Sequence, residues 1–256
     1  MTQRSRSTFA VLGFALAISL SGCALLPRMY REEPIVSDAE AQRIVQRLHT
    51  LDHTALKHET DYLGEFVPSF YQIVNEADTV FDANAEIRII RNRHADTLAR
   101  VGATFYNRIM IEGCGKLRDG RIVTYDTRID GEIRFKVTEA PFGEGYASVP
   151  LVPYRTVAVD PEVIELGSIL YVPAAVGVQL CNGSEHDGIF IAEDIGSAIR
   201  ENRIDFFVGF DDHIRNRFSE SGALVHGNAT RVYRIRGAFG RALATSIHRN
   251  STELLP

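Results

Sequence analysis

The sequence predicts a mainly β fold, because short stretches of alternating or apolar residues recur along its second half, separated by turn residues. The alternation is clearest in residues 132–137. Further short strands are predicted at 155–159, 168–172, 188–192 and 231–235. Glycine, proline and aspartate separate these segments. Many short strands with turn signals between them are typical of a β-sandwich or a β-barrel.

Helical periodicity is restricted to three segments. Residues 37–40, Ser-Asp-Ala-Glu, form a capping-box pattern ahead of apolar residues at helical spacing, which predicts a helix over about 38–51. The segment 83–107 also has apolar residues at helical spacing. Within 211–222, paired aspartates, two apolar residues and a final glycine predict one short capped helix.

The N-terminus has the pattern of a lipoprotein signal peptide. Arg4 and Arg6 precede an apolar stretch, 9–20, which matches the core of a signal peptide and is shorter than the roughly 20 residues of a membrane span. Leu20-Ser-Gly-Cys23 then resembles a bacterial lipobox. We therefore predict a signal peptide over 1–22, lipidation of Cys23 and a charged linker over 23–36. An ordinary signal peptide, or a short buried helix with a chance cysteine, is the alternative.

The composition of the remaining chain limits its partners. About 234 residues follow the predicted cleavage site, enough for one large domain with an appendage. The formal charge is −5 for the whole chain, and the loss of Arg4 and Arg6 makes the predicted mature form more acidic. An acidic chain lacks the electrostatic pattern of a nucleic-acid-binding protein, so no nucleic-acid partner is predicted. Ala24, in place of an aspartate after the lipidated cysteine, favours the periplasmic face of the outer membrane.

Two further cysteines, Cys114 and Cys181, lie beside glycines in loop-like sequence. In an oxidising periplasm they could form a disulfide, and two unpaired thiols are the alternative. Neither has a second cysteine or histidine at ligand spacing, so no metal site is predicted.

Three aspartates lie within strongly apolar, strand-like sequence: Asp160, Asp194 and Asp205. A carboxyl between Ile204 and Phe206 is expected to be partly desolvated, which raises its pKa and keeps it protonated. A protonated acid is what the cleavage of a glycosidic bond requires, because the leaving oxygen must receive a proton. From the residues alone, an aspartate at a strand end with satisfied hydrogen bonds is the more common arrangement.

Four segments in the same order resemble the 3D-domain family, which is named for its three aspartates and includes membrane-bound lytic transglycosylases of the A type. The first three are Glu112-Gly-Cys-Gly115, then Thr156-Val-Ala-Val-Asp160-Pro after Pro150-Leu-Val, and Ile164-Glu-Leu-Gly-Ser-Ile-Leu-Tyr-Val-Pro173. The last is Ala192-Glu-Asp-Ile-Gly-Ser-Ala-Ile-Arg200 with Arg203-Ile-Asp205. The resemblance spans most of residues 66–240.

This resemblance implies a double-psi β-barrel over 66–240, with added N-terminal helices over 37–65 and a C-terminal tail over 241–256. It also implies cleavage of the MurNAc–GlcNAc β-1,4 bond of peptidoglycan without water, with formation of a 1,6-anhydro product and with no metal or cofactor. Asp205 falls on the position of the acid/base, and Asp194 on the neighbouring aspartate that tunes it or stabilises positive charge.

The resemblance further places a substrate-binding surface at Glu112, Gly113, Gly196 and Ser197. The partners that it implies are peptidoglycan glycan strands, with attachment to a membrane through the lipid on Cys23. We expect the protein to be monomeric.

The chain departs from the family pattern at several positions. Ser197 and Glu201 replace glycines, and Cys114 replaces a serine. Residues 113–150 are too few for the second, inserted domain of the transglycosylases, so a shallower cleft is expected. These departures motivate an alternative function, a non-catalytic envelope lipoprotein that binds glycan or a cell-wall partner through the same groove.

Other polar motifs favour structural roles. Asp160, followed by a proline, is predicted to accept backbone N–H groups in a turn. Glu185-His186-Asp187, between glycines, is predicted to be an exposed loop rather than a metal site. Tyr71 and Tyr125 are expected in the core, with stacking on sugar rings as the alternative.

Overall fold

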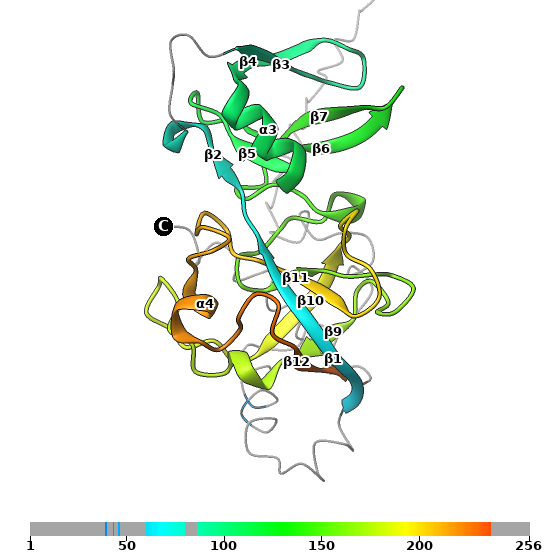
Figure 1. The fold of residues 1–256 in the computed structure, drawn as a ribbon, viewed down its shortest axis with the longest axis vertical. Helices are drawn as coiled ribbons and strands as arrows, with labels where there is room; N and C mark the ends of the chain where they lie inside the picture. The colour runs from blue at the N-terminus through cyan, green and yellow to red at the C-terminus, as the bar shows by residue number, and fades with distance from the viewer. Residues whose placement is uncertain (1–38, 40–42, 44–45, 47–59, 80–85, 237–256) are drawn as a thin grey trace, which may run out of the picture.

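The computed structural model describes residues 39, 43, 46, 60–79 and 86–236. They form two lobes, of which one is a barrel and the other is built mainly from the segment between residues 74 and 138 (Figure 1). The predicted signal peptide, the linker and the tail over 241–256 lie outside the described residues, and so does the predicted helix over 38–51 apart from three of its residues. None of the helices in the described ranges is long and apolar enough to cross a membrane.

The first lobe is a closed barrel of strands in the order β1-β11-β8-β10-β9-β12. Two strand pairs are parallel, β1 with β11 and β8 with β10, and the other neighbours are antiparallel. The strands are β1 (Thr60–Tyr71), β8 (Thr156–Ala158), β9 (Ile169–Tyr171), β10 (Ile189–Asp194), β11 (Arg203–Phe207) and β12 (Thr230–Ile235). The predicted mainly β fold with a double-psi β-barrel is confirmed.

The barrel is closed around one apolar core. Phe66, Val157, Phe190, Ile204 and Phe206 come from different positions along four of its strands and are buried together. Each fully buried side chain of this size contributes about 1.5–3 kcal/mol relative to its exposed form. The core therefore fixes the register of the strands, and the register determines where the polar residues at the strand ends lie.

The second lobe contains a sheet, a hairpin and a helix. The sheet has the order β2-β5-β6-β7, and the hairpin joins β3 to β4. The elements are β2 (Val74–Asn75), β3 (Ile87–Arg91), β4 (Thr97–Gly102), α3 (Ala103–Glu112), β5 (Cys114–Lys116), β6 (Ile122–Ile129) and β7 (Glu132–Thr138). The apolar face of α3, with Phe105 and Ile109, packs on Val123 and Phe135 of the sheet and on Ile90 of the hairpin.

The helix predicted over 83–107 is wrong for most of its described residues. Residues 87–91 and 97–102 pair as antiparallel strands, and only Ala103–Glu112 is helical. Ile90 and Val101 pack against Phe105 across the hairpin, so their burial comes from strand pairing rather than from one helical face. Ala95 adopts a left-handed conformation, with φ of 67°, in the connecting turn.

The order of the two lobes along the chain corrects the predicted domain boundaries. Residues 60–65, predicted in the helical N-terminal segment, belong to β1 of the barrel. The predicted barrel domain over 66–240 is interrupted after β1 by the second lobe, and the barrel resumes at β8. The expectation that 113–150 leaves too little chain for a second domain is wrong, because that lobe begins at residue 74 and takes its hairpin and helix from before residue 113.

Short helical elements connect the strands. The predicted capped helix within 211–222 is α4 (Arg217–Ser221), with Asn216 rather than an aspartate as its N-cap and Gly222 as its C-cap. Three single 3-10 turns complete the described elements: η3 (Glu76–Asp78), η4 (Tyr146–Ser148) and η5 (Pro173–Ala175).

Candidate active site

The barrel brings Asp194 and Asp205 to either side of one residue. In β8, Ala158 is the register partner of Asp194 in β10 and of Asp205 in β11. Two inter-strand spacings of about 4.8 Å place the two aspartate Cα atoms roughly 10 Å apart. The register shifts between Ala192 and Asp194, which redirects the end of β10. The predicted pair is therefore assembled on rigid neighbouring strands, with the small side chain of Ala158 between its members.

The Asp194 carboxylate accepts three hydrogen bonds. The Tyr71 hydroxyl donates to Oδ2 at 3.0 Å, and the backbone N–H groups of Tyr146 and Ile195 donate to Oδ1 at 3.1 and 2.9 Å. Burial raises the pKa of Asp194 to about 6, and the nearby charge of Asp205 adds to the rise, whereas the three donors act in the opposite direction. These donors stabilise the ionised form of a carboxyl that has lost much of its water.

Asp205 has a different environment from Asp194. Its register partner in β1 is Ser69, whose hydroxyl lowers the pKa of Asp205 but makes no hydrogen bond of good geometry to Oδ1. Asp205 Oδ1 is buried without a hydrogen-bond partner among the described residues. Burial raises the pKa of this carboxyl to about 6. A buried oxygen without a donor favours the protonated form, because ionisation there lacks compensation.

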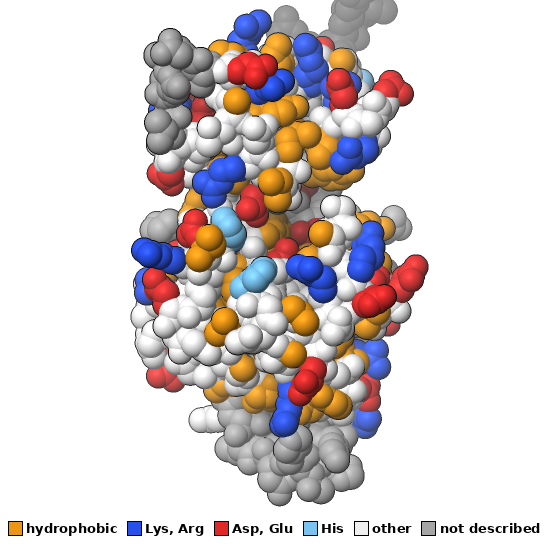
Figure 2. All heavy atoms as spheres, viewed as in Figure 1, with side chains coloured by type: hydrophobic (Ala, Val, Ile, Leu, Met, Phe, Trp, Pro, Cys, Tyr) orange, Lys and Arg blue, Asp and Glu red, His pale blue; other side chains and the backbone are white. Residues whose placement is uncertain are grey.

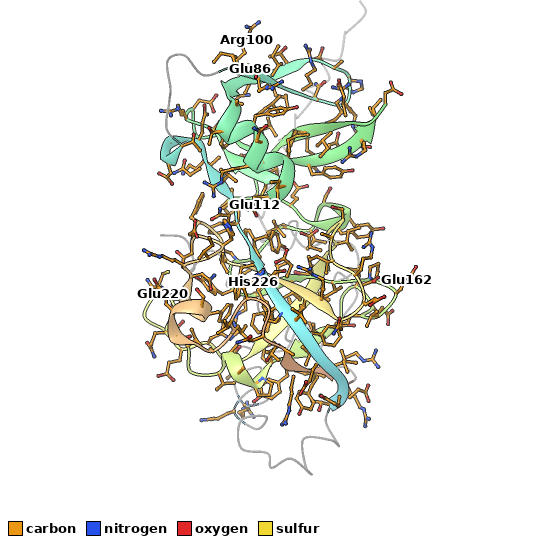
Figure 3. All side chains as sticks on the ribbon, viewed as in Figure 1. Glu86, Arg100, Glu112, Glu162, Glu220 and His226 are labelled. Carbon is orange, nitrogen blue, oxygen red and sulfur yellow. The ribbon has the colours of Figure 1, made fainter. Side chains whose placement is uncertain are left out.

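Glu112 adds a third carboxyl from the second lobe. It is the last residue of α3, and Figure 3 shows it where the lobes meet, above His226 of the barrel. Its Oε2 accepts the backbone N–H of Gln72 at 3.0 Å. Burial raises the pKa of Glu112 to about 7, and the charges of Asp205 and Asp212 add to the rise, while the Gln72 N–H and Arg108 lower it. Glu112 is therefore close enough to Asp205 for their charges to interact.

The end of β1 holds all three carboxyls in place. Ser69 lies opposite Asp205, the Tyr71 hydroxyl bonds to Asp194, and the Gln72 N–H bonds to Glu112. The buried Gln72 side chain also lies between Asp211 and Arg108. In the amide orientation that satisfies both neighbours, its nitrogen donates to the Asp211 carbonyl at 2.8 Å and its oxygen accepts from Arg108. The segment that crosses from the barrel into the second lobe thus fixes the distance between the carboxyls of the two lobes.

The surface between the lobes is hollowed. Figure 2 shows acidic and histidine side chains gathered in this waist, below the apolar patch of the second lobe. Tyr146 and Ile195, whose backbones hold Asp194, have half-exposed side chains. Tyr71 is buried, as predicted for a core residue, whereas Tyr125 is exposed and that expectation is wrong.

The third aspartate, Asp160, has the predicted turn role. Its Oδ1 accepts the backbone N–H of Glu162 at 3.1 Å, and its Oδ2 accepts that of Glu201 at 2.8 Å. Hydrogen bonds from these two N–H groups lower the pKa of Asp160. Asp160 therefore holds the loop that connects β10 to β11, the strands that carry Asp194 and Asp205.

That loop contains the other predicted groove residues. A Cβ at Gly196 would lie 2.5 Å from Ile199, so the glycine permits a close approach, while Ser197 is exposed. Glu201 has a φ of 55°, a left-handed conformation that explains why glycine suits this position. Gly113 has a φ of 81° as the C-cap of α3 and follows Glu112 directly.

Cys114 is buried and Cys181 is exposed, and both are free thiols, so the disulfide that was one of two alternatives does not form. The expectation of an exposed loop at 185–187 is wrong for His186. This histidine is buried, stacks on Phe190 with ring centroids 4.6 Å apart, and bonds through Nε2 to the Tyr154 carbonyl at 2.6 Å. Phe190 is four residues away, but the other contacts, from Phe218 and the Tyr154 carbonyl, come from distant segments and leave no signal in the sequence. Within the described residues, no three histidine, cysteine, aspartate or glutamate side chains are grouped as metal ligands.

Comparison with known families identifies the region that carries both aspartates. Residues 155–226 match the 3D domain. The predicted resemblance to the 3D domain is confirmed over these residues. This match includes Asp160, Asp194 and Asp205, together with strands β8 to β11 of the barrel. The sequence has no match among curated proteins.

Several solved structures are similar to the chain. E. coli MltA with bound chitohexaose is 14% identical, with 76% of this chain and 83% of that chain covered and a TM-score of 0.49. The membrane-bound lytic murein transglycosylase from Agrobacterium tumefaciens is 14% identical, with coverage of 84% and 83% and a TM-score of 0.47. The lytic transglycosylase LtgG of Burkholderia pseudomallei is 15% identical, with coverage of 75% and 83% and a TM-score of 0.39.

Proposed function

We propose that this protein is a peptidoglycan lytic transglycosylase that cleaves the MurNAc–GlcNAc β-1,4 bond and forms a 1,6-anhydro product. The observation that carries the proposal is the unequal pair of buried carboxyls within the 3D match. Asp194 has three hydrogen-bond donors, whereas Asp205 Oδ1 has none among the described residues. Burial raises the pKa of each carboxyl to about 6. We assign the ionised form to Asp194, because its donors stabilise a negative charge, and the protonated form to Asp205, whose Oδ1 lacks a donor; a charge on either carboxyl disfavours ionisation of the other.

This division assigns the steps of the reaction. Protonated Asp205 donates its proton to the glycosidic oxygen, and the bond between that oxygen and C1 of MurNAc breaks. Ionised Asp194 stabilises the positive charge that develops on the sugar ring. Asp205, now ionised, takes the proton from the C6 hydroxyl, whose oxygen attacks C1 and closes the anhydro ring. No water enters this sequence, and Asp205 finishes protonated, as it began.

The cleft between the lobes is the proposed glycan-binding surface. Glu112 and Gly113 form the wall from the second lobe, and Gly196 and Ser197 form the wall from the barrel loop. Tyr146 and Ile195 expose apolar surface beside Asp194, which suits contact with the faces of sugar rings.

The test is digestion of purified sacculi by the full chain, with mass spectrometry of the soluble fragments. Wild-type protein is expected to release muropeptides that are lighter by one water than hydrolysis products. Asp205→Asn is expected to release almost none. Asp130→Asn is the matched control, because Asp130 is exposed in the turn between β6 and β7 and its left-handed conformation tolerates asparagine. Intact sacculi with all three proteins, or products with reducing ends only, would reject the proposal.

The alternative function, non-catalytic binding of glycan or a cell-wall partner through the same cleft, gives the opposite result in the same experiment. Sacculi would then pull down wild type and Asp205→Asn equally, without soluble products from either. The departures at Ser197 and Glu201 lie on the exposed loop rather than at Asp194 or Asp205, which favours the enzyme.

We further propose that the enzyme is anchored by lipid on Cys23 at the periplasmic face of the outer membrane. The lipobox-like residues Leu20–Cys23 support this proposal. Labelling of cells with a clickable fatty acid should tag the wild-type chain and leave Cys23→Ser untagged. Equal labelling of both chains would disprove lipidation at this residue.

A further inference from the structure

The second lobe contains a groove outside the carboxyl cleft. It has a volume of about 320 Å³ and lies between strands β3 and β7. Residues 88–91 form one wall and 131–135 the other, while Tyr106 and Met110 of α3 line it from below. This volume is at the lower end of the range for small-ligand pockets, which is about 300–1,000 Å³.

Both walls of the groove are sheet edges. Within the described part of the chain, β3 pairs only with β4, and β7 pairs only with β6. The two strands nevertheless lie near each other, as Figure 1 shows at the top of the second lobe. An unpaired edge presents backbone N–H and C=O groups, and an extended peptide can pair with it as an added strand. Because β3 and β7 lie too close together for a strand between them at about 4.8 Å from each, a peptide can pair with one of the two edges.

The charge of the groove selects for an anionic ligand. Arg88, Arg91 and Arg134 line it, with Glu132 as its only acidic lining residue; Arg88 also pairs with Glu86, beside the groove, at 2.8 Å. Arg134 is mostly buried and bonds to Glu132 through one terminal nitrogen at 2.8 Å, but its Nε has no hydrogen-bond partner among the described residues. A guanidinium is suited to a carboxylate, which it can bind through its terminal nitrogens. Such a cluster contrasts with the chain as a whole, whose formal charge is −5.

The groove is linked to the carboxyl cleft by one helix. Tyr106 and Met110 face the groove, and Glu112 ends the same helix in the cleft. A rise of 1.5 Å per residue places Tyr106 about 9 Å from Glu112 along the helix axis. Glu112 lies on a different side of α3 from Tyr106 and Met110. A ligand held in the cleft therefore reaches the groove with a branch that runs along and around the helix, which takes several residues of extended chain.

We propose that the groove between β3 and β7 binds a peptide stem of the peptidoglycan substrate, through one of its two backbone edges and through contacts of the arginines with the carboxylates of the stem. This inference rests on the proposed function, because it takes the glycan in the cleft as the part to which the stem is attached. An extended, carboxylate-bearing peptide fits one edge, the arginines and the apolar lining together.

The experiment measures binding of two probes by isothermal titration calorimetry. One probe is a peptidoglycan tetrasaccharide with its peptide stems, and the other is the same tetrasaccharide without stems. The full chain is used in the Asp205→Asn background so that neither probe is consumed. Arg88→Ala removes an exposed groove arginine, and Arg134→Lys keeps the charge but removes the free Nε. Arg100→Ala is the matched control, since Arg100 lies on β4 of the same hairpin, labelled in Figure 3, and does not line the groove.

The stem-bearing probe is expected to bind the parent protein and Arg100→Ala equally, and to bind each groove variant about 3- to 10-fold more weakly. The stem-free probe should bind all four proteins alike. Equal affinity of the parent for both probes, or groove variants that bind the stem-bearing probe like the parent, would overturn the proposal. A groove that instead holds a second copy of the chain would show a lower molecular mass in light scattering after Arg88→Ala, which would also overturn it.

The failure of this inference can be distinguished from failure of the proposed function. If wild type forms anhydro products and the groove variants bind the stems normally, the groove proposal fails and the proposed enzyme activity stands. If the stems bind in an arginine-dependent manner but wild type leaves sacculi intact, the proposed transglycosylase activity fails and the peptide-binding groove stands.

Discussion

The loop at Asp160 and the strand ends at Asp194 and Asp205 lie close together around β8. The aspartates nevertheless differ in their hydrogen bonds and in the direction of their pKa shifts. Asp160, two residues beyond Ala158, accepts two backbone N–H groups, and these bonds lower its pKa. Asp205, beside Ala158, has a buried oxygen without a partner among the described residues, and burial raises its pKa to about 6. An aspartate in an apolar stretch thus stabilises the fold where backbone N–H groups donate to its carboxylate. Where such donors are missing, the buried carboxyl stays available for proton transfer.

The largest expected effect is on catalysis by Asp205. Asp205→Asn retains the shape of the side chain but removes the transferable proton, so the rate of sacculus cleavage should fall about 10²- to 10⁴-fold. The release of soluble muropeptides over time measures this rate. Because asparagine at position 160 can keep only part of the hydrogen bonding there, Asp160→Asn should reduce thermal stability and leave the rate per folded molecule near that of wild type. A loss of rate per folded molecule at position 160 that equals the loss at 205 would break the comparison.

The second effect is on stability, with opposite signs at the two positions. Because the pKa of Asp205 is raised in the folded state, its unfolded form ionises first, and stability is lost as the pH rises from about 4 to about 6. Asp205→Asn removes this loss, so the free energy of unfolding at pH 8 should rise by about 1–3 kcal/mol. Thermal unfolding at pH 4 and pH 8 measures it.

Asp160 has a lowered pKa, so its contribution is present above the unfolded pKa and is lost as the pH falls through the folded pKa. Asp160→Asn should therefore lower the melting temperature at pH 8 and have less effect in strong acid. Destabilisation by Asp205→Asn at pH 8 would contradict the view that this site is under electrostatic strain.

A smaller effect is expected from the donor that holds Asp194. Tyr71→Phe removes the hydroxyl that bonds to Asp194 Oδ2, and with it an interaction that lowers the pKa of this carboxyl. The pKa of Asp194 should rise by about one unit, so the acidic limb of the activity profile moves to higher pH and activity below pH 6 falls up to about tenfold. Tyr62→Phe, at the exposed start of β1, is the matched control and should not move the limb. An unchanged pH profile of activity in Tyr71→Phe would contradict the assignment of Asp194 as the ionised carboxylate.

The smallest effect concerns the second lobe. Burial raises the pKa of Glu112 to about 7, and the charge of Asp205 adds to the rise. The two carboxyls titrate close together, so a charge on either one disfavours ionisation of the other. Glu112→Gln retains an acceptor for the Gln72 N–H but removes the charge, so the alkaline limb of the profile should move to lower pH by less than about one unit. Glu220→Gln on the exposed side of α4 is the control, and equal profiles for all three proteins would exclude this coupling.

Much of the barrel could be predicted because the information is local. The alternating segments at 188–192 and 231–235 became β10 and β12, and the ordered motifs located Asp194 and Asp205. What joins those carboxyls to the rest of the site is not local. Tyr71 and Gln72 act through hydrogen bonds over 123 and 40 residues of sequence, so their roles were not visible in a pattern.

The predictions that were wrong failed for the same reason, because the burial of these residues depends on contacts from other parts of the chain. Ile90 and Val101 fit a helical period, but they lie on the two strands of a hairpin because the sheet and α3 bury them in that form. His186 lies between polar neighbours, yet Phe190 and Phe218 enclose it from two segments. The second lobe was missed because the first barrel strand lies before it in the chain. Its length can be counted only once β1 is paired with β11.

The most direct test of the central claim is digestion of sacculi in water enriched in a heavy oxygen isotope, followed by mass spectrometry of the released sugars. In the proposed reaction the C6 hydroxyl of the substrate, and not water, attacks C1 after Asp205 has donated its proton. The account predicts anhydro products without heavy oxygen from wild type and almost no products from Asp205→Asn. Reducing-end sugars that carry heavy oxygen would contradict it, because they would show that water completes the cleavage.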